Sequence, residues 1–213
     1  MKTDDLISML ARNEPAPDRA GLTRTLIALV AGGVLLSFLL VYFLLQLNPA
    51  LGTVVSSLWF WVRFAFIASL AGLTWWTLRR LGKPGAAANV RWWPLLLPFV
   101  ALGVLAAVIL MQAPADMRLA MLLGTTWRVC SMLIALVSLP LFVAAVLIVR
   151  HFAPVRLRFT GAVLGLFAGA MAALVYTLHC PELSPAFLIV WYSLGMLIPA
   201  AVGAALGERL LRW

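Results

Sequence analysis

The hydrophobic positions of this chain fall into six long runs. The runs cover residues 25–47, 54–78, 93–111, 128–149, 159–178 and 185–206. Each is close to the roughly 20 residues that an α-helix needs to cross about 30 Å of hydrocarbon. The runs lack the alternation of barrel strands, and backbone polar groups must be paired inside a bilayer, so helices are the expected form. The pattern predicts an all-α, polytopic membrane bundle of six transmembrane helices.

Little of the chain lies outside these runs. Residues 1–24 form the longest polar segment, which is too short to bury a core of its own. We therefore expect two parts, a cytoplasmic N-terminal segment over residues 1–24 and a transmembrane domain over residues 25–213. A weakly amphipathic stretch, residues 116–126, is expected to lie along the outer surface.

Composition supports a membrane protein. The chain is 64% hydrophobic and only 11% charged, whereas soluble domains carry about 25% charged residues. The net charge of +9 would also suit a nucleic-acid-binding protein. The basic residues gather at the ends of the runs, however, as membrane topology requires, so direct nucleic-acid binding is not expected.

The distribution of basic residues predicts the orientation. Arg118 and Arg128 fall on one side of the predicted bundle, Arg63 lies within the second run, and the other thirteen of the 16 Lys and Arg fall on the opposite side. Lys and Arg are in excess in cytoplasmic loops. Both termini are therefore expected in the cytoplasm, with the bundle in a bacterial inner membrane. The thirteen residues are Lys2, Arg12, Arg19, Arg24, Arg79, Arg80, Lys83, Arg91, Arg150, Arg156, Arg158, Arg209 and Arg212.

The two cysteines are the first candidates for chemistry. Cys130 and Cys180 lie near the outer ends of different runs, so both thiols should sit at similar depth. In an oxidising compartment two neighbouring thiols can form a disulfide. The nearby Arg128 and His179 would favour the thiolate and raise its reactivity toward oxidants and soft metals. The alternative is that each cysteine is a small apolar residue packed between helices.

A metal site is a second interpretation of the same residues. His179 and Glu182 could add ligands to the two thiolates, a set that suits zinc, cadmium or another soft ion. No C-x-x-C or H-x-x-x-H spacing supports it. We therefore expect transient capture of a toxic metal by Cys130 and Cys180, and no resident cofactor.

Arg63 is anomalous because it is a charge inside an apolar run. An unpaired charge at that depth costs several kcal/mol, so the side chain must snorkel, pair or line a wet cavity. One interpretation is snorkelling among aromatic neighbours. The functional interpretation is an inward-facing pair with Glu182 or Asp116 that orders the outer end of the bundle near the cysteines.

Two further features concern packing. Gly161, Gly165 and Gly169 recur every four residues in the fifth run, and small residues at that spacing allow helices to approach closely. The contact is either within the chain or a dimer face. Pro140 and Pro199 lie inside the fourth and sixth runs, where proline bends a helix.

The N-terminal segment predicts a short helix. Asp4 and Asp5 would lie in its first turn, where the helix dipole favours acids, and Leu6, Ile7 and Leu10 would form a small apolar face. Such a peptide suits a groove with basic rims on a partner protein. The alternative is a solvated, frayed tail.

Motifs of enzymes are missing from the sequence. It contains no G-x-S-x-G, no H-E-x-x-H, no P-loop and no paired intramembrane carboxylates. We therefore expect no enzyme. The leading alternatives are a small transporter or permease with Arg63 lining its path, and a membrane thiol oxidoreductase, which normally needs a reactive thiol pair closer in sequence.

Several stretches together resemble the NrsF-like family of membrane anti-sigma factors. They are MKTDDLI at residues 1–7, WRVC at 127–130, LHCPE at 178–182 followed by SP at 184–185, VWYSL at 190–194, and LRW at 211–213. The six-run layout agrees with that family. Leu183 departs from it, because a more polar residue would be expected there.

The resemblance implies a function. It suggests a negative regulator that holds an extracytoplasmic-function sigma factor at the inner membrane. Heavy metals or oxidants would be sensed through two cysteines, whose positions match Cys130 and Cys180, and the sigma factor would then be released. The acidic N-terminal segment, with Asp4 and Asp5, would suit the basic surface of such a sigma factor.

Overall fold

The computed structural model describes residues 19–82, 90–152 and 154–212, and every regular element in these ranges is helical. This confirms the all-α prediction. The helices are α2 (Arg19–Leu40), α3 (Leu51–Val55), α4 (Leu58–Leu81), α5 (Leu97–Gln112), α6 (Ala115–Leu123), α7 (Trp127–Val137), α8 (Leu139–Arg150), α9 (Leu157–Tyr176), α10 (Pro185–Phe187) and α11 (Ser193–Leu210). π-helical turns at Val41–Leu45 and Leu188–Tyr192 continue α2 and join α10 to α11, and a 3₁₀ turn at Trp93–Leu96 leads into α5.

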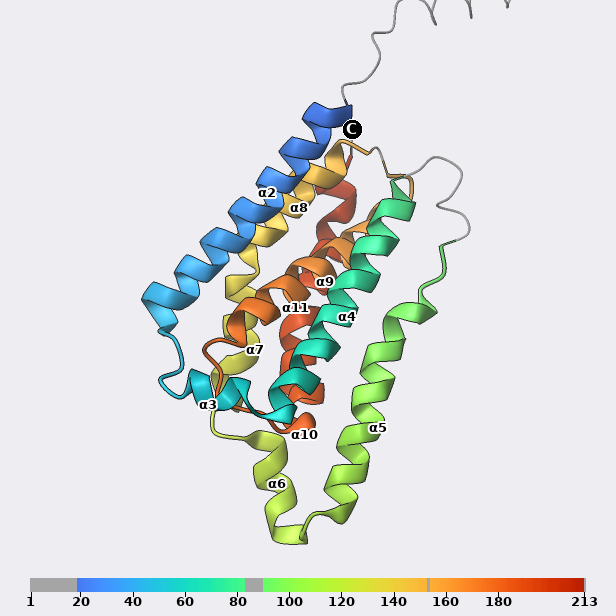
Figure 1. Cartoon of the computed structure of the whole chain (residues 1–213). Helices are drawn as coiled ribbons and strands as arrows, with labels where there is room; N and C mark the ends of the chain where they lie inside the picture. Colours follow the sequence, from blue (N-terminus) through green and yellow to red (C-terminus); the bar gives the residue numbers. More distant parts are fainter. Residues whose placement is uncertain (1–18, 83–89, 153, 213) are drawn as a thin grey trace, which may run out of the picture.

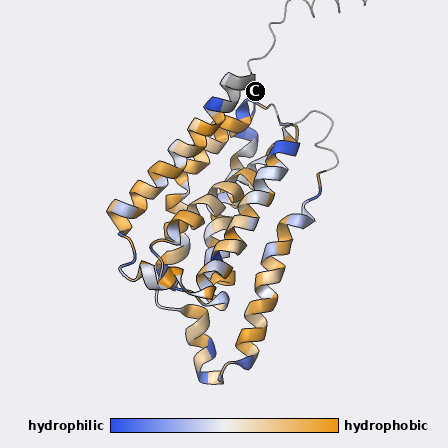
Figure 2. Cartoon of the chain, viewed as in Figure 1, coloured by the Kyte–Doolittle hydropathy of each residue, from blue (hydrophilic) through white to orange (hydrophobic). Residues whose placement is uncertain are grey.

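Six stretches of these helices are long and apolar enough to cross a membrane, as predicted. They are Arg24–Leu45, Leu58–Leu81, Trp93–Gln112, Ala115–Arg150, Leu157–Tyr176 and Pro185–Leu210. Most of the amphipathic stretch at residues 116–126 belongs to α6, none of whose side chains is buried, and α6 lies within the fourth of these stretches. Large apolar side chains are also exposed on the outside of the bundle, and Figure 2 shows that α2 and α5 consist mostly of hydrophobic residues. Such a surface suits contact with lipid.

Local sequence explains where the helices begin and break. The second run begins its helix later than predicted, because the Ser57 hydroxyl caps α4 by accepting from the Trp59 N–H at 3.3 Å. The fourth run is divided into α7 and α8 at Ser138, two residues before Pro140, which has no N–H to offer. Pro199 lies inside α11. Of the two expected bends, the one at Pro140 therefore appears as a break between two helices.

Helix α9 is the centre of the bundle. It lies between α2 and α4 and against α11 (Figure 1), and 78% of its span is buried, against 17% for the first span. Its glycines make this packing close. A Cβ on Gly161 would collide with the carbonyl oxygen of Gly203, and one on Gly169 would lie 2.9 Å from the Cα of Met196. The glycine repeat therefore serves contact within the chain rather than a dimer face.

The two ends of the bundle differ in charge. The "basic end" is the end where α2 begins and α4, α8 and α11 finish (Figure 1). The "thiol end" is the opposite one, where α6, α10 and the first turn of α7 lie. The described arginines near the basic end are Arg24, Arg79, Arg80, Arg91, Arg150, Arg156, Arg158, Arg209 and Arg212.

Candidate sensor site: a buried thiol pair

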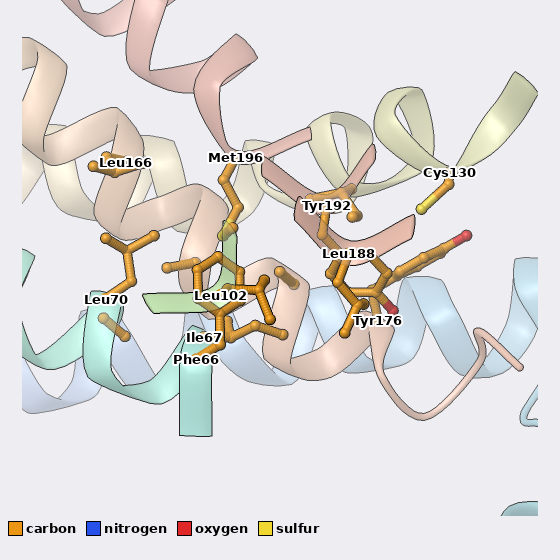
Figure 3. Packing of buried hydrophobic residues seen from close by; sticks show 14 of the residues in the cluster. Phe66, Ile67, Leu70, Leu102, Cys130, Leu166, Tyr176, Leu188, Tyr192 and Met196 are labelled. Carbon is orange, nitrogen blue, oxygen red and sulfur yellow. The ribbon is translucent and has the colours of Figure 1, made fainter. Parts of the chain in front are cut away.

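The two cysteines come together at the thiol end. Cys130 lies in the first turn of α7, and Cys180 lies in the connection between α9 and α10. Both are free thiols, both are completely buried, and Cys130 lies close enough to Cys180 to lower its pKa. They belong to one core cluster, in which the Cys130 sulfur points toward the side of Tyr176 and Tyr192 (Figure 3). The expectation that the thiols lie at similar depth therefore holds, and they are neighbours.

Two tyrosines enclose the thiol pair. Tyr176 ends α9 and Tyr192 ends the second π-helical turn, and their ring centroids are 5.9 Å apart. The Tyr192 hydroxyl is buried, makes no hydrogen bond at standard distance, and interacts with the Cys180 thiol at longer range. Sequence reasoning missed both residues. Their signal was a tyrosine in an apolar run, whose hydroxyl needs a partner once it is buried.

Arg63 holds the backbone around Cys180. Its side chain is completely buried on α4. Nη1 donates to the carbonyls of Cys180 at 3.0 Å and Glu182 at 2.9 Å, and Nη2 donates to the carbonyl of Thr177 at 3.0 Å. These carbonyls follow the C-terminus of α9, where the helix dipole favours a cation. The inward-facing interpretation is therefore the one observed, with backbone carbonyls in place of the expected carboxylate.

The surroundings of Cys180 favour its thiolate. Cys180 lies outside the membrane-spanning stretches. The interaction with Cys130 is the largest cause that lowers the pKa of Cys180, and the Glu182 backbone N–H and the Arg63 charge act in the same direction. Burial opposes them, because it disfavours the charged form. A thiolate is the form that attacks oxidants and binds soft metals.

The Glu182 carboxylate binds a second segment. Its Oε1 accepts from the Thr125 backbone N–H at 2.7 Å and from the Thr125 hydroxyl at 2.6 Å. Gly124 makes this approach feasible, since it has a φ of 58° and a Cβ there would lie 2.8 Å from the carboxylate. The Thr126 hydroxyl lies 4.0 Å from the Cys180 sulfur. The turn before α7 therefore wraps around the segment that carries Cys180.

His179 connects the site to the first span. Its Nδ1 lies 2.8 Å from the Gln46 carbonyl, and the Asn48 N–H donates to the Leu178 carbonyl at 3.0 Å. The imidazole is thus used to join two loops. Within the residues that the structure describes, no group of three His, Cys, Asp or Glu side chains could hold a metal ion. A metal ion at this site would therefore be bound by the two thiols. It would have fewer protein ligands than the predicted set of two thiolates, His179 and Glu182.

The remaining predicted residues lie elsewhere. Arg128 is exposed and its guanidinium stacks on Trp127 at 5.3 Å, so it does not face the Cys130 thiol. Side chains two positions apart on a helix point in different directions. The prediction that Arg128 favours the Cys130 thiolate, which rested on their proximity in the sequence, is therefore wrong. Asp116 lies in the exposed first turn of α6. The predicted docking residues Asp4, Asp5, Leu6, Ile7 and Leu10 fall outside the described residues.

Fold and site together define a six-span helical bundle that carries a buried thiol pair at one end and an arginine-rich face at the other. Residues 10–213 match the family model described as "Negative regulator of sigma F", NrsF. The chain belongs to this family of negative regulators of a sigma factor, which confirms the resemblance read from the sequence.

Two curated relatives match over their whole length and that of this chain. The probable anti-sigma-F factor NrsF of Azospira oryzae is 41% identical over 215 residues, and the anti-sigma-F factor NrsF of Caulobacter vibrioides is 36% identical over 223 residues. No solved structure matches the chain. The family description suggests a regulatory role.

Proposed function

We propose that this protein is an anti-sigma factor of the bacterial inner membrane. It holds an extracytoplasmic-function sigma factor on the cytoplasmic side, and it releases that factor when an oxidant or a soft metal ion modifies Cys130 and Cys180 on the other side. The buried, interacting thiol pair carries the proposal. Cys180 lies in the connection between α9 and α10, and this connection is hydrogen-bonded to Arg63 of α4, to Thr125 before α7 and to Gln46 after the first span.

Orientation supports the two-sided arrangement. The basic end carries most of the described arginines, and Lys and Arg are in excess on the cytoplasmic side of membrane proteins. The thiols would then face the periplasm, where disulfides form. The N-terminal segment, residues 1–24, enters α2 at the basic end. Its acidic and apolar residues would therefore be presented to a cytoplasmic sigma factor.

The chemistry follows from the thiol pair. A two-electron oxidant would accept two electrons from Cys130 and Cys180, one sulfur–sulfur bond would form, and two protons would leave. A soft metal cation would instead displace both protons and bond to both sulfurs. A disulfide would hold the two sulfurs about 2.05 Å apart, whereas a metal ion would hold each sulfur at its own bonding distance, about 2.3 Å for zinc. Complete burial favours small reagents over protein thiols.

Arg63 supports a route from the thiols to the basic end. Movement of the 180–182 backbone would disturb two hydrogen bonds to the Arg63 side chain of α4, a helix whose other end carries Arg79 and Arg80. A coupling free energy of about 1–3 kcal/mol would change sigma-factor affinity by about 5–150-fold. The transporter alternative loses support here, because both Nη atoms of Arg63 are already occupied by carbonyls.

The test is co-purification of the host's sigma factor with the tagged, membrane-embedded protein, with and without cadmium or dichromate. Wild type is expected to retain the factor and to release it under stress, whereas Cys130→Ser and Cys180→Ser should retain it under both conditions. Met132→Leu is a matched control, because it removes an exposed sulfur from the same helix. It should behave as wild type.

A deletion separates the docking role from the sensing role. Removing residues 1–20 should abolish retention of the sigma factor while leaving metal-dependent protection of the two thiols intact. If the intact protein retains no sigma factor at all, the anti-sigma proposal fails. If Cys130→Ser and Cys180→Ser still release the factor under stress, the thiol sensor fails while the anti-sigma role stands.

A further inference from the structure

A lateral groove opens between α2 and α4, near the basic end of the bundle. It is about 730 Å³ in volume, which falls within the roughly 300–1,000 Å³ of small-molecule sites. Its walls are apolar side chains such as Ile27 and Val30 of α2 and Trp75 of α4, and Phe167 of α9 forms part of its floor. We call it the α2–α4 groove.

The lining of the groove changes from apolar to basic near the basic end of the bundle. Arg79 belongs to its lining and also to an adjoining hollow of about 320 Å³, which Trp75, Trp76 and Arg80 complete. The Arg80 guanidinium stacks on the Trp76 ring at 3.9 Å. Both arginines are exposed, and within the described ranges neither forms an ion pair. The site therefore joins an apolar slot to two guanidinium groups that have no acidic partner there.

We propose that the α2–α4 groove binds an anionic phospholipid. One acyl chain lies in the slot, and the phosphate lies against Arg79 and Arg80. Basic pockets between transmembrane helices on the cytoplasmic side are typical sites for anionic headgroups. Tryptophans at the same level mark the depth at which headgroups begin. Because the guanidinium groups of Arg79 and Arg80 are positively charged, the groove favours an anionic lipid over a neutral one.

Glycine at position 72 keeps the slot open. Gly72 lines the groove, and a Cβ added to it would meet nothing within 4 Å. A longer side chain there would project into the slot without displacing backbone. Gly32 of α2 also has open space around a Cβ, but it does not line the groove. Leucine at these two positions gives a matched pair, one that fills the groove and one that does not.

The experiment is native mass spectrometry of the full chain, titrated with phosphatidylglycerol or with phosphatidylcholine of the same acyl chains. Wild type should bind one phosphatidylglycerol more tightly than phosphatidylcholine. Arg79→Gln should weaken that preference about fivefold, and Gly72→Leu should weaken binding about tenfold by excluding several methylenes. Gly32→Leu and Arg209→Gln, which removes an exposed charge from α11 at the same end, should behave as wild type.

Three results would overturn the proposal. Equal binding of the two lipids would remove the role of the arginines. An effect of Arg209→Gln as large as that of Arg79→Gln would show diffuse attraction to a basic surface. A dimer that Gly72→Leu dissociates would assign the groove to a second copy of the chain. None of these results bears on the anti-sigma role, because no sigma factor is present in the experiment.

Discussion

The Arg63 guanidinium donates a hydrogen bond of 3.0 Å to the backbone carbonyl of Cys180, although 117 positions separate the two residues. The bond joins α4 to the loop that carries Cys180 and fixes the carbonyl of that thiol-bearing residue. The same side chain reaches two more carbonyls, so a single cation organises the end of α9. Predictions about the site begin from this contact.

Replacing Arg63 with methionine should destabilise the protein. Three buried carbonyls would lose their donor in an apolar interior, and hydrogen bonds to charged groups contribute about 1.5–3 kcal/mol each. Some of that cost is recovered by removing a buried cation, so we expect a net loss of about 3–5 kcal/mol. The measurement is unfolding of the full chain in detergent. Arg118→Met is the control, since Arg118 also donates to carbonyls but is exposed, and it should cost under about 1 kcal/mol.

Alanine at Gly161 should open the contact between α9 and α11. Its Cβ would collide with the Gly203 carbonyl oxygen, and overpacking of this kind costs about 1–3 kcal/mol. Gly32→Ala is the counterpart, because its Cβ enters open space on α2. That change should raise stability by about 0.5–1 kcal/mol through helix propensity. Equal melting temperatures for the two variants would contradict the intramolecular role of the glycine repeat.

Much of the architecture could be predicted because membrane spans are governed by length and apolarity alone. Six spans follow from those rules, and the break near Pro140 follows from the N–H that proline lacks. The exact helix starts did not follow, since the beginning of α4 depends on a single capping hydroxyl, Ser57. Glycine spacing indicated close packing, but the choice of partner helix required the tertiary arrangement.

The site was only partly predictable. The two thiols and Arg63 were singled out because each is unusual in an apolar run. Arg128 was misjudged, since sequence distance does not reveal which way a helical side chain points. Tyr176 and Tyr192 were missed because a buried aromatic residue is ordinary in sequence. Their importance depends on a long-range contact with the thiols.

The bond between Glu182 and Thr125 should be measurable by a double-mutant cycle. Glu182→Ala removes the acceptor of two hydrogen bonds, and Thr125→Val removes one donor, the hydroxyl. Each single change is expected to cost about 1–2 kcal/mol, and the double change should cost less than their sum. Unfolding of the four proteins in detergent gives the interaction energy. Strict additivity would show that the carboxylate does not hold the turn before α7.

The lowered pKa of Cys180 predicts an unusual pH profile for its reaction with a small thiol reagent. The interaction with Cys130 holds the pKa of Cys180 below its usual range, so a larger fraction of Cys180 is thiolate at pH 7 than for an ordinary thiol with a pKa of about 8.5. Its reactivity should therefore fall off at a lower pH than that of an ordinary thiol, whose rate declines as the pH drops below about 8.5. Because burial limits access, the quantity to compare is the pH at half-maximal rate rather than the rate itself.

Cys130→Ala tests the cause of this shift. It removes the largest interaction that lowers the pKa of Cys180 and leaves burial, which raises it, in place. The half-maximal pH of Cys180 labelling, followed by mass spectrometry of the modified peptide, should therefore rise toward that of an ordinary thiol. Cys130→Ser keeps a hydroxyl donor at the same position and should restore part of the shift. An identical profile in wild type and Cys130→Ala would mean that the two thiols titrate independently, and a thiol pair acting as one sensor would then lose its physical basis.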